Sequence, residues 1–452
     1  MTGSHPVSLV EPGVDYQSVT AQISAVPLRA PGRGWLIGFG VTLLGVTAFV
    51  VAITWLFWQG VGIWGIQSPV FWGLVIASYV WWISMAHAGT LISGLLLIVN
   101  RGWRNSLNRF AEAMTVFAVV QAGISPILHL GRPWLFFWLL PYPNTMTVWP
   151  QFRSPLEWDI FGVTTYLIYS VLFWYMGLLP DLASVRDRAS SRFGQVAYGI
   201  LCLGWRNSAE HWRRWQIAYW ISAALAVPLV TMVESGVSLL FAVGIIPGWH
   251  TTIYPPYFLL IAVQEGFAVV LLISITLRAC FDLYDVVTER HLDMLAQLLL
   301  LFSMATTYCF LFEGFVGWYS GDEFERNTLW GRAFATYPWT YWSAMLGVVF
   351  APNALWFRSL RRKVPVLALV ALMVTVGVWL AHFTEVEASL ARDFLPAAWQ
   401  VYTPSAWEWM LLGGMISVWF CLFFLFVRLL PMISMFELKE VLHADKQEVR
   451  NG

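Results

Sequence analysis

Long apolar stretches recur along the whole chain, and this recurrence limits its fold more than any other feature. A membrane-spanning α-helix needs ~20 consecutive, mainly apolar residues to cross the hydrocarbon core of a bilayer. Ten stretches meet this requirement: about 35–58, 70–99, 108–130, 156–179, 216–243, 256–281, 293–319, 337–357, 364–386 and 405–430. Prolines inside them do not exclude helix, because neighbouring groups can satisfy the freed backbone. We therefore expect an all-α polytopic membrane protein with ten transmembrane helices.

The low charge of the chain agrees with this class. Only 12% of the 452 residues are charged, whereas a soluble domain carries roughly a quarter. The formal net charge is zero, so nothing indicates binding to nucleic acid. Residues 1–34 are polar and proline-rich and lack a basic region followed at once by an apolar run. We therefore expect no cleaved signal peptide and a retained first span.

The distribution of basic residues predicts the orientation. With ten spans, 21 of the 26 Lys and Arg residues fall on the side of the two termini and 5 on the other side: Arg132, Arg153, Arg326, Arg332 and Arg392. Cytoplasmic loops carry the excess of positive charge. We expect a multi-pass protein of the bacterial inner membrane with both termini in the cytoplasm.

Spans two to five and spans six to nine have a similar layout. The sequence around His87 resembles that around Glu265, and Glu112 and Asp159 have counterparts in Asp293 and Thr340. We expect two four-helix bundles related as parallel repeats, with one flanking helix at each end. The expected segments are 1–34 (cytoplasmic), 35–69 (first flanking helix and outer loop), 70–243 (first bundle), 244–387 (second bundle), 388–430 (last flanking helix) and 431–452 (cytoplasmic tail).

The four cysteines are scattered singly, with no CxxC or CxxCH motif. The chain therefore shows no signature for an iron–sulfur cluster or a c-type haem of its own. A b-type haem needs two histidines at matched depth on facing helices, and His87 has no such partner. We expect no metal or haem in this chain.

Ionisable residues within spans are functional candidates by default. His129 at the outer end of span three, Arg132 just beyond it and Asp159 one turn into span four are expected to converge at the outer face, with Gln121 and Tyr166 deeper. Imidazole and carboxylate groups suit the oxidation of a quinol, which releases two protons with two electrons. The alternative is an interfacial ion pair of Asp159 with Arg132 or Arg153.

Other polar residues lie deeper or in the second half. His87, Glu234 and Glu265 are candidates for a proton path, although interhelical hydrogen bonding would explain them equally. For Glu313, His382 and Glu385, near outer helix ends, we expect plain solvation. The long aromatic or acidic outer segments 131–155 and 320–336 suit a docking surface for an extracytoplasmic subunit.

At these residues the sequence resembles a known family. "HLGRPW" at 129–134, "RSPLEWDIFGVTTYLIYS" from 153 and "HAGTLISGLLLI" at 87–98 are similar to the NrfD/PsrC quinone-interacting membrane subunits. The flanking spans and the HAGT sequence resemble most closely the ActC subunits of bacterial alternative complex III. The resemblance implies eight core spans in two bundles and a quinone site at the periplasmic face.

The resemblance also implies the chemistry and the partners. His129 and Asp159 match the histidine and aspartate of the family's quinol site, and Arg132 is a candidate for steering or docking. Menaquinol or ubiquinol would be oxidised there, with electrons passing to a periplasmic iron–sulfur subunit and c-type haem subunits, beside a second NrfD-like membrane subunit. The chain would act as a subunit of a quinol oxidoreductase, with proton translocation as an open possibility.

Three other functions stay open at this point. The chain could be the quinone-interacting anchor of a molybdopterin oxidoreductase of the polysulfide reductase type, although ten spans instead of eight argue against it. It could be a secondary transporter built on repeats, but transporter repeats are often inverted. It could also be a non-catalytic paralogue, which the presence of both His129 and Asp159 disfavours.

Overall fold

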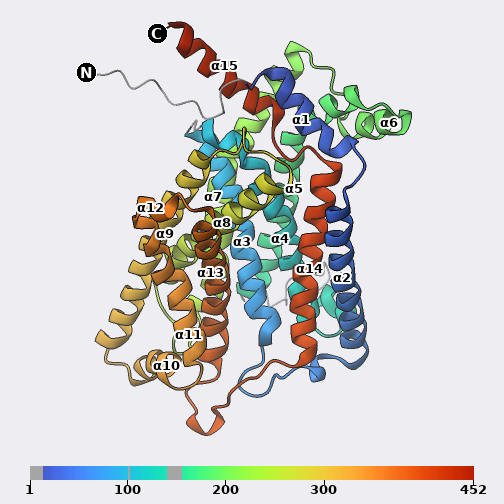
Figure 1. Cartoon of the computed structure of the whole chain (residues 1–452). Coiled ribbons are helices and arrows are strands. Elements are labelled where there is room, and N and C mark those ends of the chain that lie inside the picture. Colours follow the sequence, from blue (N-terminus) through green and yellow to red (C-terminus); the bar gives the residue numbers. More distant parts are fainter. Residues whose placement is uncertain (1–13, 100–101, 140–154, 452) are drawn as a thin grey trace, which may run out of the picture.

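The computed structural model describes residues 14–99, 102–139 and 155–451, which form helices joined by short connections and contain no β-strand (Figure 1). Nine of the described helices are long and apolar enough to cross a membrane. These are α2 (Arg33–Gln59), α3 (Gly73–Ile98), α4 (Asn108–His129), α5 (Pro155–Arg188), α7 (Ala209–Ala242), α8 (Tyr254–Cys280), α9 (Glu289–Tyr319), α13 (Val364–Phe383) and α14 (Ala406–Leu429).

The remaining expected span, 337–357, is helical but not a single α-helix. It consists of α11 (Pro338–Met345), the π-helical turn η6 (Leu346–Phe350) and the 3₁₀ segment η7 (Ala351–Trp356). No regular α-helix of spanning length occurs between α9 and α13, so the predicted count of ten is not reached by α-helices alone. Whether this composite segment crosses the membrane stays a prediction.

Pro352 explains why the composite segment changes its helical type. Proline has no N–H, so it cannot donate to the carbonyl of Val348, four residues earlier. That carbonyl instead accepts hydrogen bonds from Gln264 Nε2 of α8 and Ser303 Oγ of α9, both at 2.8 Å. Side chains from two neighbouring helices thus satisfy the backbone group that the proline leaves free.

The long helices form two closed rings that share an interface. Around the first ring, α3 contacts α4, α4 contacts α5, α5 contacts α7, and α7 returns to α3. Around the second, α8 contacts α9, α9 contacts the composite segment, the composite segment contacts α13, and α13 returns to α8. Helices α3 and α7 contact α8 across the interface, and α2 packs with α14 along one side of the first ring (Figure 1).

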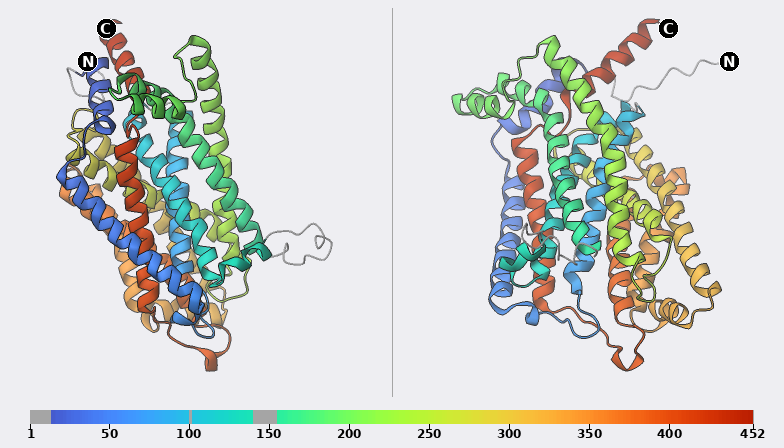
Figure 2. Two further views of the ribbon diagram at one scale, coloured as in Figure 1. Left: turned by 90° about the vertical axis from the view of Figure 1, so that its right-hand side faces the viewer. Right: turned by 180° about the vertical axis from the view of Figure 1, so that it is seen from behind.

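Shorter helices lie at the two ends of the molecule. Figure 2 shows α1 (Tyr16–Leu28), α6 (Arg192–Leu201) and α15 (Met435–Asn451) gathered at one end, which we call the α15 end, and α10 (Glu323–Phe334) at the opposite end. The remaining short elements are η1 (Val61–Ile63), η2 (Gly102–Ser106), η3 (Pro133–Leu139), α12 (Arg358–Arg361), η8 (Thr384–Ala388) and η9 (Pro396–Ala398).

Helix α3 is the core of the assembly. All its residues from Gly73 to Gly94 are buried except Ile76, which is half-buried. Small residues allow this close packing. A Cβ at Gly89 would overlap the backbone of Ala111 on α4, and one at Gly266 on α8 would overlap Ala88. Small residues at such contacts let helix backbones approach closely in membranes.

We predict that Gly89→Ala destabilises the protein by about 1–3 kcal/mol, because the added methyl group overpacks the contact between α3 and α4. Gly123→Ala on α4 is the matched control, because a Cβ there meets no atom within 4 Å. Thermal unfolding in detergent measures both variants. Equal melting temperatures for the two variants would contradict the prediction.

Candidate functional site

The centre of the first ring holds a buried imidazole–carboxylate pair. His87 of α3 and Glu234 of α7 are fully buried, and His87 Nδ1 is hydrogen-bonded to Glu234 Oε2. The Tyr166 ring of α5 lies 4.5 Å from the His87 ring, measured between centroids. Its hydroxyl donates to Ala86 O at 2.8 Å or Thr90 Oγ1 at 2.9 Å. Three helices therefore fix the position of this pair.

Asp159 continues the pair toward the end opposite α15. Tyr79, two turns before His87 on α3, donates a hydrogen bond from its hydroxyl to Asp159 Oδ2. Asp159 also lies within electrostatic range of His87 and Glu234. The aspartate predicted for an outer site and the pair predicted for a proton path thus belong to one cluster, which we call the α3 cluster: Tyr79, His87, Asp159, Tyr166 and Glu234.

Glu265 of α8 lies at the edge of this cluster. It is fully buried, and Ser84 and Trp81 of α3 lie beside its carboxylate, with Glu234 within electrostatic range. No ion pair joins it to an Arg, Lys or His side chain among the described residues. A buried carboxylate without a cation is costly, so packing alone does not explain Glu265.

His129 is the last residue of α4 and lies close to the connection between α2 and α3. Its ring is 5.9 Å from that of Trp64, between centroids. The buried polar atoms His129 Nδ1, Trp64 Nε1 and both amide atoms of Gln121 have no hydrogen-bond partner among the described residues. Gln121, Ser125 and His129 follow one another at four-residue spacing, so they share one face of α4.

The predicted outer residues are therefore only partly gathered. His129 and Asp159 come from adjacent helices, α4 and α5, but no hydrogen bond or ion pair joins them in the described part of the chain. Arg132 is exposed and is not paired with Asp159. Arg153, the other arginine considered for such a pair, lies outside the described residues.

The expectation of plain solvation for Glu313, His382 and Glu385 is wrong. His382 is fully buried, and its Nδ1 lies 3.0 Å from Glu385 Oε2. Glu385 also accepts a hydrogen bond from the Tyr257 hydroxyl. The Glu313 side chain is 13% exposed and accepts from Arg332 Nη1 at 2.8 Å. Helix α10 and the Trp249 side chain cover this end of the second helix ring. The sequence places these residues at helix ends but does not reveal that other segments cover them.

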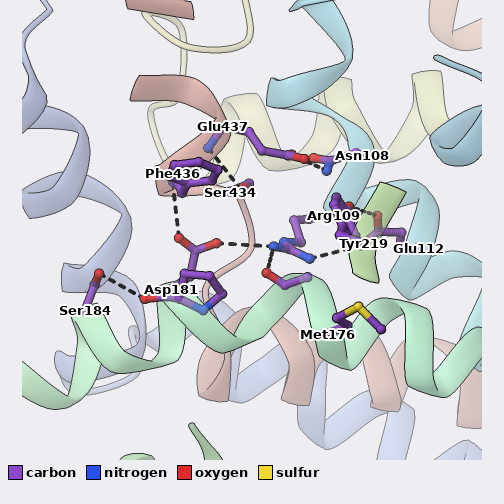
Figure 3. Close-up of polar contacts among 12 residues, drawn as sticks. Asn108, Arg109, Glu112, Met176, Asp181, Ser184, Tyr219, Ser434, Phe436 and Glu437 are labelled. Atoms are coloured by element: carbon purple, nitrogen blue, oxygen red, sulfur yellow. Dashed lines mark hydrogen bonds and ion pairs between the residues drawn. The ribbon is translucent and has the colours of Figure 1, made fainter. Parts of the chain in front are cut away.

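A second ionic cluster lies at the α15 end of the first ring (Figure 3). Arg109 of α4 is buried between Glu112, whose Oε2 is 3.1 Å from Arg109 Nη1, and Asp181 of α5, whose Oδ2 is 3.3 Å from Nη2. Glu112 also accepts hydrogen bonds from Ser93 of α3 at 2.7 Å and Tyr219 of α7 at 3.1 Å. All four helices of the ring thus meet at this carboxylate and guanidinium.

Helix α15 is attached to the same cluster. Glu437 accepts hydrogen bonds from Arg104 and from Asn108 Nδ2, the latter at 2.5 Å. The Phe436 N–H donates to Asp181 Oδ1 at 3.3 Å. Arg104 lies outside the spans, and the neighbouring Glu437 carboxylate raises its pKa against the lowering effect of burial. The contacts fix α15 across this end of the first ring.

Sequence reasoning missed several of these groups. Tyr79 and Trp64 stand in apolar stretches, where an aromatic residue is ordinarily read as packing. A usable signal for Tyr79 was its spacing of eight residues from His87, which places both on one face of α3. Within the described residues, no group of three or more His, Cys, Asp or Glu side chains could hold a metal ion.

The fold is that of a helical membrane protein with a buried cluster of acid–base residues in its first ring. A family model described as "Polysulphide reductase, NrfD" matches residues 62–392. The chain therefore belongs to the NrfD family of membrane subunits. The match includes both rings and excludes α2 and α14.

Two relatives agree with this family. The C subunit of the selenate reductase of Mesobacillus selenatarsenatis is 24% identical over 417 residues, covering 87% of this chain and 92% of that protein. A protein of Halobacterium salinarum, described as the membrane C subunit of a dimethyl sulfoxide reductase, is 26% identical over 259 residues, covering 54% of this chain and 51% of that protein. Both relatives are named as parts of reductases.

We predict that Arg109→Gln destabilises the protein by about 3–5 kcal/mol, because it leaves Glu112 and Asp181 as buried carboxylates without their cation. Arg213→Gln is the matched control: Arg213 also pairs with a glutamate three residues away, Glu210, but both are exposed. Thermal unfolding should show a large loss for the first variant and no measurable change for the second. A loss of similar size in both would contradict a special role of burial.

Proposed function

We propose that this chain is the quinol-oxidising membrane subunit of an oxidoreductase complex. The observation that carries the proposal is the α3 cluster, in which Asp159 is hydrogen-bonded to Tyr79 and lies within electrostatic range of the His87–Glu234 pair. Such a cluster can accept a proton near the outer end and pass it inward. Membership of a family of reductase membrane subunits supports an electron-transfer role over that of a secondary transporter.

The chemistry requires two proton acceptors. Menaquinol or ubiquinol, as the substrate, loses two electrons to a partner subunit and one proton from each hydroxyl group. We assign the first proton to His129, whose Nδ1 has no partner among the described residues. We assign the second to the carboxylate of Asp159, from which it can move toward the His87–Glu234 pair within electrostatic range. Both groups are acid–base types whose charge responds to their surroundings.

The remaining residues of the proposed pocket take different roles. The Gln121 amide has no partner in the described part of the chain for its donor or its acceptor, so it suits a hydrogen bond to the quinol head group. The Tyr166 hydroxyl is already hydrogen-bonded to α3, so we assign the ring to positioning of His87. Arg132 is exposed and belongs to the docking of a partner rather than to the ring site.

We further propose a proton path through the first ring. Glu234 and His87 receive the proton from the outer carboxylate, and Glu265 offers a second buried acceptor on α8. Thr90 and Ser93 of α3 continue the polar side chains toward Glu112 and the α15 end. In this proposal both termini lie in the cytoplasm, so the α15 end is the cytoplasmic end. The path then connects the outer quinol site with the cytoplasmic side.

The exposed aromatic residues after α4 suit the docking of the electron acceptor. Trp134 is 57% exposed, and Leu135 and Phe136 next to it are also exposed. They follow His129 and Arg132 directly, so a protein bound there would lie over the proposed quinol site. We assign this surface to an extracytoplasmic iron–sulfur subunit, which would accept the two electrons one at a time.

Two kinds of complex fit this membrane component. The names of the relatives favour a reductase. The alignment with the selenate reductase protein extends beyond the 62–392 core, so the additional flanking helices do not argue against a membrane subunit of a reductase. The sequence motifs favour an assembly of the alternative complex III type, with c-type haem subunits and a second NrfD-like subunit. Cofactor analysis of the purified assembly separates them: molybdenum indicates the first, and c-type haem the second.

We predict that Asp159→Asn lowers quinol oxidation by the purified complex ~100-fold or more, because the amide cannot accept the proton. The matched control is Asp285→Asn, an exposed aspartate at the α15 end. Turnover is measured on equal amounts of intact complex for both variants. Near-normal turnover in Asp159→Asn would make this residue an interfacial counter-ion and remove the proposed quinol site.

We predict that Glu234→Gln retains measurable quinol oxidation but abolishes proton translocation, because the His87 ring loses its carboxylate partner. Reconstituted vesicles with an entrapped pH indicator measure translocation and turnover together. Glu210→Gln, on the exposed first turn of the same helix, should leave both unchanged. Undiminished translocation in Glu234→Gln would exclude the path through this pair.

A further inference from the structure

A groove of about 510 Å³ opens on the side of the molecule near the α15 end. Its deeper wall is apolar and comes from α4, α5 and α14: Phe117, Trp174, Leu422, Leu425 and Phe426. Its upper part comes from the end of α1, from α6 with its N-cap residue and from the last turn of α14: Leu28, Ser191, Ala197, Tyr198 and Leu429. The volume lies in the ~300–1,000 Å³ range of small-molecule sites.

Helix α6 places the upper part of this groove at the level of the lipid head groups. Gly194, Ala197 and Leu201 of α6 line the groove. Away from the groove, Val196 is 54% exposed and Ile200 is 69% exposed on the same helix. A short helix with such an uncovered apolar face lies in the membrane interface with that face toward the acyl chains. Figure 2 shows α6 directed away from the rings at this end.

The groove itself is lined by uncharged residues, and Arg428 stands at its edge, next to the lining residue Leu429. Arg428 of α14 donates to the carbonyl of Val26, which precedes the groove residues Pro27 and Leu28. It also lies within electrostatic range of Tyr198, whose hydroxyl donates to Leu429 O at 3.0 Å. Arg428 and the nearby Arg188, whose Nη1 lies 3.4 Å from Ser24 Oγ, form no ion pair with a carboxylate in the described part of the chain.

We propose that this groove binds one anionic phospholipid. An acyl chain would fill the apolar part between α4, α5 and α14, and the phosphate would lie beside Arg428 at the rim. Basic pockets between transmembrane helices recognise acidic lipid head groups in this way. The proposal is independent of the quinol site, which lies toward the opposite end of the first ring.

Charge complementarity favours a lipid over the other occupants that such a groove can take. A quinol has an uncharged head group, so it would leave Arg428 without a counter-ion. A transmembrane helix of a partner would place apolar side chains against the same arginine. A phospholipid alone combines a long apolar chain with an anionic group at interface depth, as the groove does.

The test uses the purified complex, stripped of lipid in detergent and then titrated with phosphatidylglycerol or phosphatidylcholine of identical acyl chains. Native mass spectrometry counts the lipids bound to the intact complex. We expect one phosphatidylglycerol to bind at concentrations where phosphatidylcholine does not. Arg428→Gln should weaken phosphatidylglycerol binding about fivefold, the effect of one basic residue at a membrane surface.

Two further variants keep the test decisive. Ala197→Trp fills the groove from α6 without changing charge and should abolish binding, and it serves if Arg428→Gln does not fold. Arg362→Gln removes an exposed arginine elsewhere and should leave binding unchanged. Equal binding of the two lipids, unchanged binding in Arg428→Gln and Ala197→Trp, or displacement of the lipid by a stoichiometric amount of quinol would each overturn the proposal.

Discussion

Helix α3 is buried around nearly its whole circumference, so partners for its polar side chains come from the helices packed around it. Tyr79 bonds to Asp159 of α5, His87 to Glu234 of α7, and Ser93 to Glu112 of α4. These three contacts lie at successive depths and join every helix of the first ring. The requirement that buried polar groups be satisfied therefore determines how the ring is assembled. It also lines up the acid–base residues along one helix.

The buried polar groups are of two kinds: those with hydrogen-bond or ion-pair partners and those without. Arg109 contacts two carboxylates and the carbonyl of Gly177, and its cluster closes the α15 end of the ring. Such paired groups are explained by structure alone. The side-chain amide of Gln121 and Nδ1 of His129 have no hydrogen-bond partner in the described residues, although unpaired buried polar atoms are costly. Both groups lie in the proposed quinol pocket, so binding of the substrate gives them a role beyond packing.

The sequence predicts the positions of nine apolar helices well, because hydropathy depends on local composition. It does not predict the composite segment after α10, because the Val348 carbonyl freed by Pro352 is satisfied by residues from distant helices. Solvation was wrongly expected for His382 and Glu385 because depth along a helix does not reveal which loop covers its end. The closeness of Asp159 to His87 depends on how α3 and α5 are rotated about their axes. In helices that are apolar on all faces, the hydrophobic pattern of the sequence does not reveal this rotation.

The closeness of Asp159 to Glu234 has a consequence for how a proton would move. Two carboxylates in electrostatic range repel each other when both carry a negative charge. Neutralising Asp159 with a proton removes this repulsion. His87 is hydrogen-bonded to Glu234 and lies within electrostatic range of Asp159, so transfer of the proton inward would leave Asp159 ready for the next one. In our proposal the residues of this chain accept only the protons. The two electrons therefore leave through a partner subunit at the outer face, next to His129.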